Sequence, residues 1–575
     1  MSAGSRLPAP LRGPARTVRD AVREAAAGPR ERRSAAWRHE RAMAPVTPPR
    51  RPSGERMRVQ VLASARLRAG LAGQWQLTDR DPAAVLVEVD ATSVVTVAAP
   101  FAEQRRAVLA ATAPVIVWVT ASARVAGDDV ARLLEDVIAP VHVVVDDEGS
   151  VAAWAAALGR PVGHAGPAAD AAVHSPAIVG STLRRDHVVA LVGDGDFDRA
   201  RLTPVQPARL DVLAGDDTVT ELPGDRPVLG HHRAAAFVAD RPLTGWHAVE
   251  AAAAGTALLA TSDVTRLPGG LAAQACPIDD DTQLRQQTIA HLWQDEVVDR
   301  SALVTARTVR TGHTFAHRAA ALETLVGRPR QARRGRPEAP FDRSVSAVIS
   351  TNRRHELDTI ADNMARQSAL AAGDLQVVLV LHGLEVPAAE VEARFRDQGI
   401  DHLAVVPADS SLTLGACLNL GIDAADGAHV AKIDDDNFYG CHYLDDLVDA
   451  IDFSGAGIAG KWAHYTWLRS TGAVVLRFPR SEHRYERLVQ GGSILMRGDV
   501  ARELRFSDLP RAVDTDLLGR ARSAGVTTYS ADRFNYVSIR GTDRHAHTWS
   551  LEDAAFMNRT SRVVFYGDPR EHVDV

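Results

Sequence analysis

Three consecutive carboxylates form the densest chemical signal in the sequence. An apolar run within residues 430–433 predicts a buried strand, and Asp434, Asp435 and Asp436 follow it directly. Closely packed like charges repel one another, and a divalent cation would remove that cost. Carboxylate oxygens are ligands that Mg²⁺ or Mn²⁺ prefers, and such sites often add oxygens from a substrate phosphate. We expect a metal–diphosphate site held through Asp434 and Asp436, which would point the same way on an extended backbone. A solvated acidic turn is the alternative.

Three further groups of residues could take part in chemistry. Gly491 and Gly492 precede a strand pattern and could adopt positive φ, so that a ligand approaches the backbone closely; a bulge at the strand start is the alternative. Asp514 precedes an apolar-periodic stretch, which predicts a helix N-cap. The polar segment 538–549 includes His547, whose imidazole could ligate a metal or stabilise a departing phosphate, although a plain surface histidine is the alternative.

The elements that must position these residues follow an α/β order. The pattern predicts a strand over 344–353, a helix over 356–371, strands over 376–381 and 402–406, and a helix over 412–425. Open α/β sheets bind ligands at the carboxyl ends of their strands, so the acidic triplet belongs at such an edge. Thr351, at the end of the first strand, and Asn352 are good capping residues for the turn into the helix.

With these elements in order, residues 341–550 resemble a family-2 glycosyltransferase of the GT-A fold. The resemblance implies a nucleotide-sugar pocket, with Thr351, Asn352 and Arg353 on the nucleotide side and Asp435 at the donor. The second strand ends at His382, where the family usually has an acidic residue that helps to read the base.

The same resemblance assigns the acceptor side of the pocket. Gly491 and Gly492 would border both donor sugar and acceptor. Asp514 would be the general base of an inverting transfer, with Asp516 as second choice; Val513 stands where the family usually has Glu. The predicted reaction moves a sugar from a nucleotide-diphosphate donor to a hydroxyl of a glycan or glycolipid acceptor, with Mn²⁺ or Mg²⁺ as cofactor.

Val-rich runs separated by Ala-rich stretches predict two Rossmann-like units before this domain, over 57–180 and 181–327. The segment from Glu250 to Gly255 resembles the donor-binding signature of GT-B glycosyltransferases, in which the acidic residue contacts the donor ribose, although Ala257 stands in place of the usual Pro. Residues 313–319 resemble the closing helix of spore-maturation-type, family-1-like enzymes. For residues 57–327 we favour a scaffold or acceptor-handling role over a second active site. The alternative interpretation of Glu250 is an ordinary exposed position on a helix.

The remaining segments are basic. Residues 1–56 hold 13 arginines and 5 acidic residues, a net charge of +8, and 328–340 forms an Arg- and Pro-rich linker. We favour a disordered tail, with contact to an anionic membrane surface as the alternative. Three scattered cysteines fit a reducing cytoplasm, and nothing indicates nucleic-acid binding. The chain has only two lysines, Lys432 and Lys461.

The fold class predicted is therefore α/β, with two GT-B-like Rossmann units followed by a GT-A transferase domain over 341–575. Two other classes of function stay open. A non-catalytic carbohydrate- or nucleotide-binding scaffold would bind without turnover. A nucleotidyltransferase ranks low, because the turn at 351–355 lacks the glycines of a phosphate-binding loop.

Overall fold

Parallel sheets dominate the fold, in agreement with the Val-rich runs. The computed structural model describes residues 56–90, 99–120, 125–171, 173–179, 189–193, 210–214, 230, 232–238, 244–262, 264–329, 342–541 and 553–575. Contacts divide these residues into an N-terminal unit, up to residue 329, and a C-terminal unit, from residue 342. Nearly all of the basic tail and most of the linker lie outside the described residues. Among those described, no helix is both long and apolar enough to cross a membrane.

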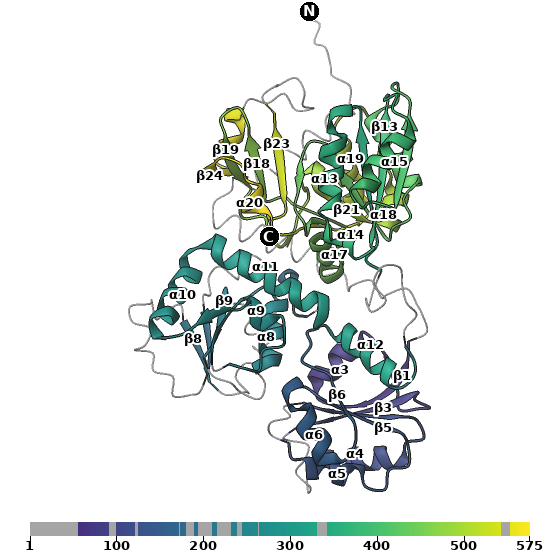
Figure 1. Ribbon diagram of the computed structural model, residues 1–575, viewed down its shortest axis with the longest axis vertical. Coiled ribbons are helices and arrows are strands. Elements are labelled where there is room, and N and C mark those ends of the chain that lie inside the picture. Colours follow the sequence, from purple (N-terminus) through teal and green to yellow (C-terminus); the bar gives the residue numbers. More distant parts are fainter. Residues whose placement is uncertain are drawn as a thin grey trace, which may run out of the picture. The chain divides into compact units, whose positions relative to one another are not determined.

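The first sheet of the N-terminal unit is entirely parallel, in the order β2-β1-β3-β4-β5-β6. Its strands are β1 Arg58–Leu62, β2 Gln76–Leu77, β3 Ala84–Val89, β4 Val115–Val119, β5 Val141–Val145 and β6 Val162–His164. Its helices are α3 Ala65–Ala72, α4 Ala99–Ala110, α5 Gly127–Leu134 and α6 Val151–Leu158. Figure 1 shows α4, α5 and α6 on one face of this sheet, where they form one apolar core, while α3 packs into a separate core on the other face.

The second sheet of this unit is also parallel, in the order β11-β10-β9-β7-β8. Its strands are β7 Val189–Gly193, β8 Leu210–Ala214, β9 Ala234–Phe237, β10 Ala257–Thr261 and β11 Cys276–Ile278. The helices of this part are α7 Pro176–Val179, α8 Thr244–Ala253, α9 Leu271–Gln274, α10 Asp281–Trp293, α11 Asp295–Gly312 and α12 Phe315–Leu325. Helix α12 returns to the first sheet, because Phe315, Ala319 and Leu322 pack into the same core as α3.

The C-terminal unit is built on an eight-stranded mixed sheet, in the order β14-β13-β12-β15-β21-β17-β22-β20. Its strands are β12 Val345–Thr351, β13 Leu375–His382, β14 Leu403–Ala408, β15 His429–Ile433, β17 Ile458–Gly460, β20 Arg484–Tyr485, β21 Ile494–Arg497 and β22 Thr528–Ser530. A second sheet, in the order β16-β23-β18-β19-β24, contains β16 Phe438–Tyr439, β18 His464–Leu468, β19 Ala473–Arg477, β23 Tyr536–Arg540 and β24 Ser561–Tyr566. Strands β12, β13, β14 and β15 are parallel neighbours, so their carboxyl ends share one edge.

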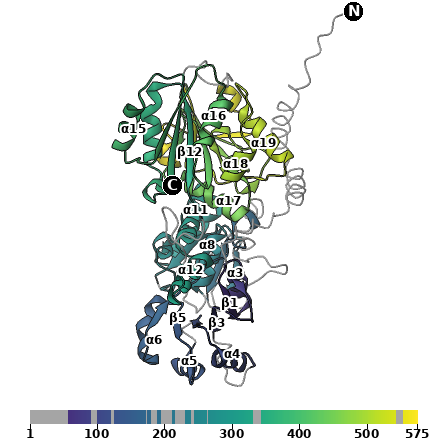
Figure 2. The same cartoon turned by 90° about the vertical axis from the view of Figure 1, so that its right-hand side faces the viewer.

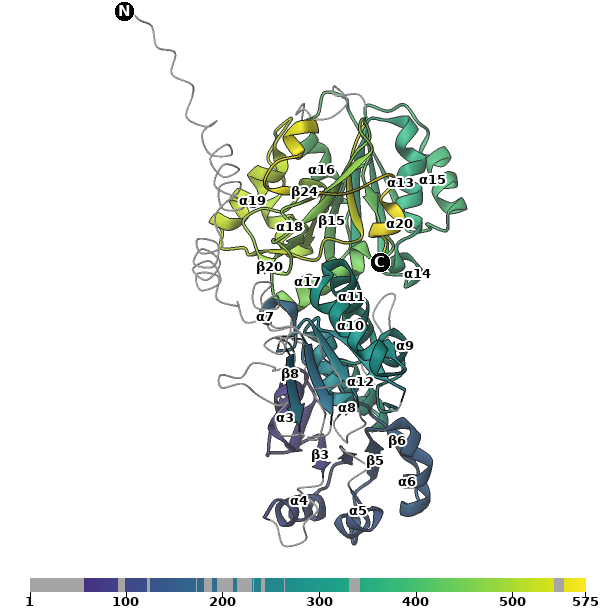
Figure 3. The same ribbon diagram turned by 90° about the vertical axis from the view of Figure 1, so that its left-hand side faces the viewer.

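Helices cover both faces of the large sheet. The helices of this unit are α13 Leu357–Ala365, α14 Ser368–Ala371, α15 Ala388–Asp397, α16 Leu414–Asp423, α17 Tyr443–Ser454, α18 Gly498–Leu504, α19 Val513–Ser523 and α20 Arg570–Val573, and the last of them contacts β23 of the second sheet. Figures 2 and 3 show α16, α18 and α19 on the side of β12 opposite to α15. Residues of α16, α18 and α19 share one apolar core with Val348, Val378 and Val430 of the sheet.

The helix predicted over 356–371 is interrupted, which corrects the sequence-based expectation. A 3₁₀ turn, Arg354–Glu356, precedes α13, and α13 ends at Ala365 before α14 begins at Ser368. Gln367 is extended there (ψ 129°), and its side-chain amide donates to the carbonyl of Gly440 at 2.9 Å. The backbone N–H of Ser368 donates to the carbonyl of Cys441 at 2.8 Å. These bonds to another segment replace intrahelical ones, so the helix breaks.

Candidate active site

A cavity of about 800 Å³ opens at the carboxyl edge of the large sheet in the C-terminal unit. The ends of β12, β13 and β15 border it, together with the start of α19 and one wall from the second sheet. The lining includes most of the residues that sequence analysis selected in this unit: Asn352, Arg353, Asp434, Asp435, Asp436, Gly491, Gly492 and Asp514. Segments that are far apart in the sequence therefore meet in one site.

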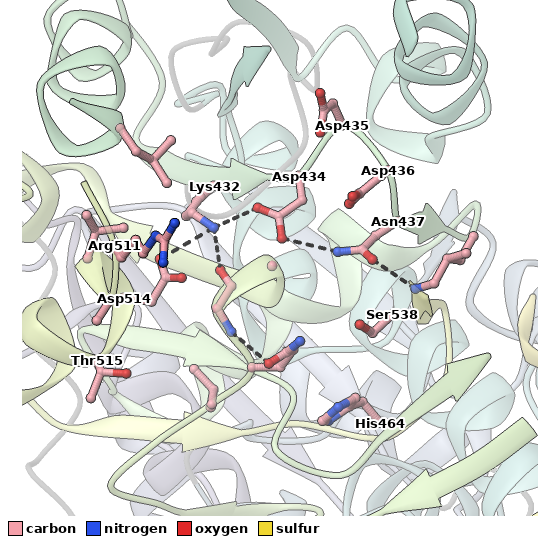
Figure 4. Close-up of a pocket in the computed structure, with 18 of the residues that line it drawn as sticks. Lys432, Asp434, Asp435, Asp436, Asn437, His464, Arg511, Asp514, Thr515 and Ser538 are labelled. Carbon is pink, nitrogen blue, oxygen red and sulfur yellow. Dashed lines mark hydrogen bonds and ion pairs between the residues drawn. The ribbon is translucent and has the colours of Figure 1, made fainter. Parts of the chain in front are cut away.

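The amino group of Lys432 occupies the centre of the acidic cluster (Figure 4). Its Nζ lies 2.7 Å from Asp434 Oδ1 and 3.4 Å from Asp514 Oδ1, and it donates to the carbonyl of Gly491 at 3.0 Å. The side chain is only 6% exposed. Burial acts to lower the pKa of Lys432, but the charges of Asp434 and Asp514 outweigh it and raise that pKa above its ordinary value. The amine is therefore a permanent cation between two carboxylates.

Asp514 lies in the first turn of α19, but it is not the N-cap. The N-cap is Ala512, which has left-handed backbone (φ 59°, ψ 25°) and makes no side-chain capping bond. The predicted capping role of Asp514 is therefore wrong, because its carboxylate is directed to Lys432. Burial raises the pKa of Asp514 to about 6 against the opposing charge of Lys432, and the charge of Asp434 adds to the rise. A carboxylate with such a pKa is ionised at neutral pH and can still accept a proton effectively.

The second candidate base, Asp516, has a structural role instead. Its Oδ2 accepts hydrogen bonds from Arg520 Nε at 2.8 Å and Ser507 Oγ at 2.6 Å. It does not line the cavity. The geometry therefore favours Asp514 over Asp516.

The three carboxylates of the acidic triplet have different partners. Strand β15 ends at Ile433, and the chain then turns, so the extended backbone that would align Asp434 with Asp436 is absent. Asp434 bonds Lys432 and accepts from Asn437 Nδ2 at 3.2 Å. Figure 4 shows Asp435 directed away from this group.

The other two carboxylates meet the end of β12. Asp435 accepts from Thr351 Oγ1 at 2.6 Å and from Arg353 Nε at 3.0 Å, and Asp436 accepts from Arg353 Nη2 at 3.0 Å. Thr351 is buried and does not line the cavity, while Asn352 and Arg353 do. Thr351 also accepts from the backbone N–H of Arg353, which fixes the turn after the strand.

A divalent cation would fit best at Asp436. Burial raises the pKa of this carboxyl to about 6, the like charge of Asp434 adds to the rise, and Arg353 opposes it. A cation would relieve this crowding of charge. Within the described residues no three His, Cys, Asp or Glu side chains group closely enough to hold a metal ion by themselves. Mg²⁺ commonly binds through one or two carboxylates and completes its shell with water and substrate phosphate, so the donor set suits a cation that arrives with a diphosphate. His547 lies outside the described residues.

The paired glycines act through their small size and not through positive φ. Residues Gly491–Ser493 form a 3₁₀ turn, and neither glycine has positive φ, contrary to expectation. A Cβ on Gly491 would collide with the carboxylate of Asp514, and a Cβ on Gly492 would collide with that of Asp434. The glycines therefore let two site carboxylates approach the backbone closely.

Several lining residues are not among those predicted from the sequence. Lys432 is the most important, and the rarity of lysine in this chain was the one available signal. His382, at the end of β13, lines the cavity with a buried Nε2 that has no hydrogen-bond partner among the described residues. The second sheet adds His464 and Arg477, and the segment between β17 and β18 adds Trp462.

Glu250 lies in the N-terminal unit and is not an exposed helix position. Every residue of α8 is buried, and Glu250 Oε1 lies 3.0 Å from Arg66 Nε and 4.0 Å from His174 Nε2. Arg66 in turn packs over the ring of Trp246, 5.7 Å from its centroid. The carboxylate is therefore held by an ion pair, and its predicted contact with a donor ribose stays a prediction.

No family model and no curated protein matches the chain. Among solved structures, the chain is similar to residues 1–349 of TarS from S. aureus in complex with UDP-GlcNAc, at 15% identity and a TM-score of 0.30, over 36% of this chain and 62% of that one. It is also similar to the mannosyltransferase PcManGT from Pyrobaculum calidifontis in complex with GDP-Man and Mn²⁺, at 15% identity and a TM-score of 0.27, over 40% of this chain and 66% of that one. Both matches span less than two thirds of those chains. At such TM-scores these likenesses carry no weight for function.

Proposed function

We propose that the C-terminal unit is a glycosyltransferase that moves a sugar from a nucleotide-diphosphate donor to an acceptor hydroxyl. The proposal rests mainly on one observation, which is the carboxylate of Asp514 held beside Lys432 in a cavity that also contains the acidic triplet. A base, a fixed cation and acidic residues suited to a metal–diphosphate complex then border a single space. This combination suits group transfer to a hydroxyl better than it suits binding alone.

In this mechanism Asp514 is the general base. Its carboxylate takes the acceptor proton as the acceptor oxygen bonds to the anomeric carbon and the bond from that carbon to the diphosphate oxygen breaks. The nucleoside diphosphate leaves with the electron pair of the broken bond. Because one base acts on the acceptor and no covalent nucleophile is assigned, we propose that the transfer inverts the anomeric configuration.

The charges around Asp514 suit this role. The amino group of Lys432 lies 3.4 Å from the carboxylate of Asp514 and holds it in place. Its positive charge also limits the rise in the pKa of Asp514 that burial causes. Asp436, together with Asp434, would hold a divalent cation. When bound, the cation would neutralise negative charge on the leaving diphosphate. Arg353 fixes Asp435 and Asp436 relative to the end of β12.

Nucleotide binding would be tested first, by thermal unfolding with UDP, GDP and their sugar conjugates, with and without Mn²⁺. Ligands that bind the native state raise the apparent Tm. We expect one nucleotide to give a Mn²⁺-dependent shift that Asp436→Asn removes. Asp426→Asn is the matched control, because Asp426 is exposed and precedes β15 at the end away from the cavity. Binding without any release of nucleoside diphosphate would favour the scaffold, and a shift unchanged in Asp436→Asn would refute the metal assignment.

A further inference from the structure

One wall of the cavity carries three aromatic rings and two guanidinium groups in a continuous series of contacts. The rings of Trp462 and Phe478 stack with centroids 4.2 Å apart and an angle of 10° between their planes. The guanidinium carbon of Arg477 lies 4.9 Å from the centroid of Phe478 and 4.9 Å from that of Phe556. The guanidinium carbon of Arg540 lies 4.5 Å from the Phe556 centroid. All five side chains line the cavity, and we call them the ring–arginine stack.

Among the described residues, Arg477 has no acidic partner. Within the part of the chain that the structure describes, no carboxylate forms an ion pair with it, and its buried Nε has no hydrogen-bond partner. Burial lowers the pKa of Arg477 to about 10, and the like charge of Arg540 contributes. Two guanidinium groups are therefore held near one another although they repel.

Contacts with the aromatic rings explain how Arg477 and Arg540 are held in place. They do not explain what the N–H groups of these two guanidinium groups bind. Aromatic faces attract a guanidinium through the ring quadrupole. The N–H donors point outward in the guanidinium plane, in a fork that matches the oxygens of phosphate or carboxylate. Two arginines that line a cavity and are held by aromatic rings suit an anionic ligand.

The backbone beside Arg477 supports a functional reason for this arrangement. Phe478 has φ 47°, in the left-handed region that a bulky residue rarely adopts. Its N–H donates to the carbonyl of Thr560 at 2.7 Å, which helps to hold this conformation. Strained residues of this kind concentrate at ligand sites, because the surrounding structure must maintain them. Here the strained residue carries the ring on which both Trp462 and Arg477 stack.

We propose that the ring–arginine stack is an anion subsite in which Arg477, aided by Arg540, binds a phosphate or carboxylate group of a substrate. This inference deepens the proposed function and rests on it for the nature of that substrate. The group could be the diphosphate of the donor or an anionic group on the acceptor, which would make the acceptor a charged glycan or a glycolipid with a phosphate. The recognising chemistry is the same in both cases.

The test is a calorimetric titration of the full chain with inorganic phosphate. We expect Arg477→Gln to weaken phosphate binding by about tenfold or more, because charge-assisted hydrogen bonds are lost. The matched control is Arg469→Gln, since Arg469 also packs over a ring, that of Trp467 at 4.9 Å, but is exposed and does not line the cavity. The Tm of each variant is measured alongside, because Arg477→Gln also removes the contacts with the rings of Phe478 and Phe556. Phosphate binding equal to that of the wild type would overturn the proposal.

Two further arms complete the design. Arg477→Lys keeps the charge but removes the donor fork, so we expect weaker phosphate binding at an unchanged Tm; unchanged affinity would again overturn the proposal, even if the Gln variant did not fold. The titration is then repeated with saturating UDP or GDP. Phosphate binding that the nucleotide blocks assigns the subsite to the donor, and binding that persists and still requires Arg477 assigns it to the acceptor. Because phosphate binding needs no turnover, its outcome is separate from that of the glycosyltransferase assay.

Discussion

The carboxylate Oδ1 of Asp514 lies 3.4 Å from the amino nitrogen of Lys432, although the two residues are far apart in the sequence. Lys432 is also bonded to Asp434, so one buried cation links the start of α19 to the acidic end of β15. This relationship places the proposed base next to the proposed diphosphate site. Lys432 also opposes the rise that burial causes in the pKa of Asp514.

The pH dependence of turnover should have an acidic limb near pH 6. The pKa of Asp514 is raised to about 6 by burial, and only its ionised form can accept the acceptor proton. Activity should therefore be full above that pH and fall as the pH decreases through it. Initial rates between pH 5 and 8 would measure the limb. Asp436 also has a pKa of about 6, so the limb must persist in the residual activity of Asp436→Asn; if it disappears there, it belongs to Asp436.

Replacing Lys432 with Met should destabilise the protein and move the acidic limb upward. The change leaves Asp434 and Asp514 close together without their cation, which should cost roughly 3 kcal/mol in the free energy of unfolding at pH 7. The loss should be smaller at pH 5, where the carboxyls accept protons. Urea denaturation at both pH values and a pH–rate profile are the measurements.

The second lysine supplies the control for that experiment. Lys461 is also buried and pairs with Asp532 at 2.9 Å, but it does not line the cavity. Lys461→Met should therefore lower stability without moving the pH–rate profile. An equal movement of the profile in both variants would contradict a specific link between Lys432 and Asp514.

Alanine at Gly491 should impair turnover more than it impairs folding. Its Cβ would collide with the carboxylate of Asp514, which would have to move from its place beside Lys432. Gly519→Ala is a matched control within α19, where an added Cβ meets nothing within 4 Å and should stabilise the helix by up to ~1 kcal/mol. Steady-state rates and Tm values of both variants would show whether Gly491→Ala impairs turnover more than folding. Wild-type turnover in Gly491→Ala would show that Asp514 need not stay in place.

Acid should destabilise the C-terminal unit partly through His464. Burial lowers the pKa of this imidazole to about 3, Arg477 adds to that effect, and the backbone bond to Trp462 opposes it. Because the folded pKa lies below the ordinary value of 6.5, the neutral form contributes stability above about pH 6.5, and this contribution is lost as the pH falls. His464→Gln should therefore lose less stability than the wild type between pH 7 and 5, as urea midpoints would record. An equal loss would argue against this role.

The sequence was sufficient to predict the elements that local patterns determine. The apolar run before Asp434 is the buried strand β15, and the Val-rich runs of the first half form parallel sheets. Periodicity could not reveal that Asp434 and Asp436 turn to different partners, because the turn after Ile433 is fixed by bonds to Thr351 and Arg353.

Contacts between segments that are far apart in the sequence could not be predicted from local patterns. Asp514 looked like an N-cap because its position fits that role locally, and only the fold brings Lys432 to it. The ring–arginine stack joins β19 to residues near β24, so no spacing in the sequence marks it. Composition did contain one usable signal, since both lysines of an arginine-rich chain are buried in ion pairs.

The most direct test of the central claim is the initial rate of nucleoside diphosphate release with Asp514→Asn, using the donor that thermal unfolding identifies. Loss of the general base should lower kcat by about 10²- to 10⁴-fold, while the donor-induced Tm shift persists. Asp516→Asn, two residues further along the same helix and outside the cavity, should stay near the wild-type rate. Turnover close to that of the wild type in Asp514→Asn would contradict the assignment of Asp514 as the base.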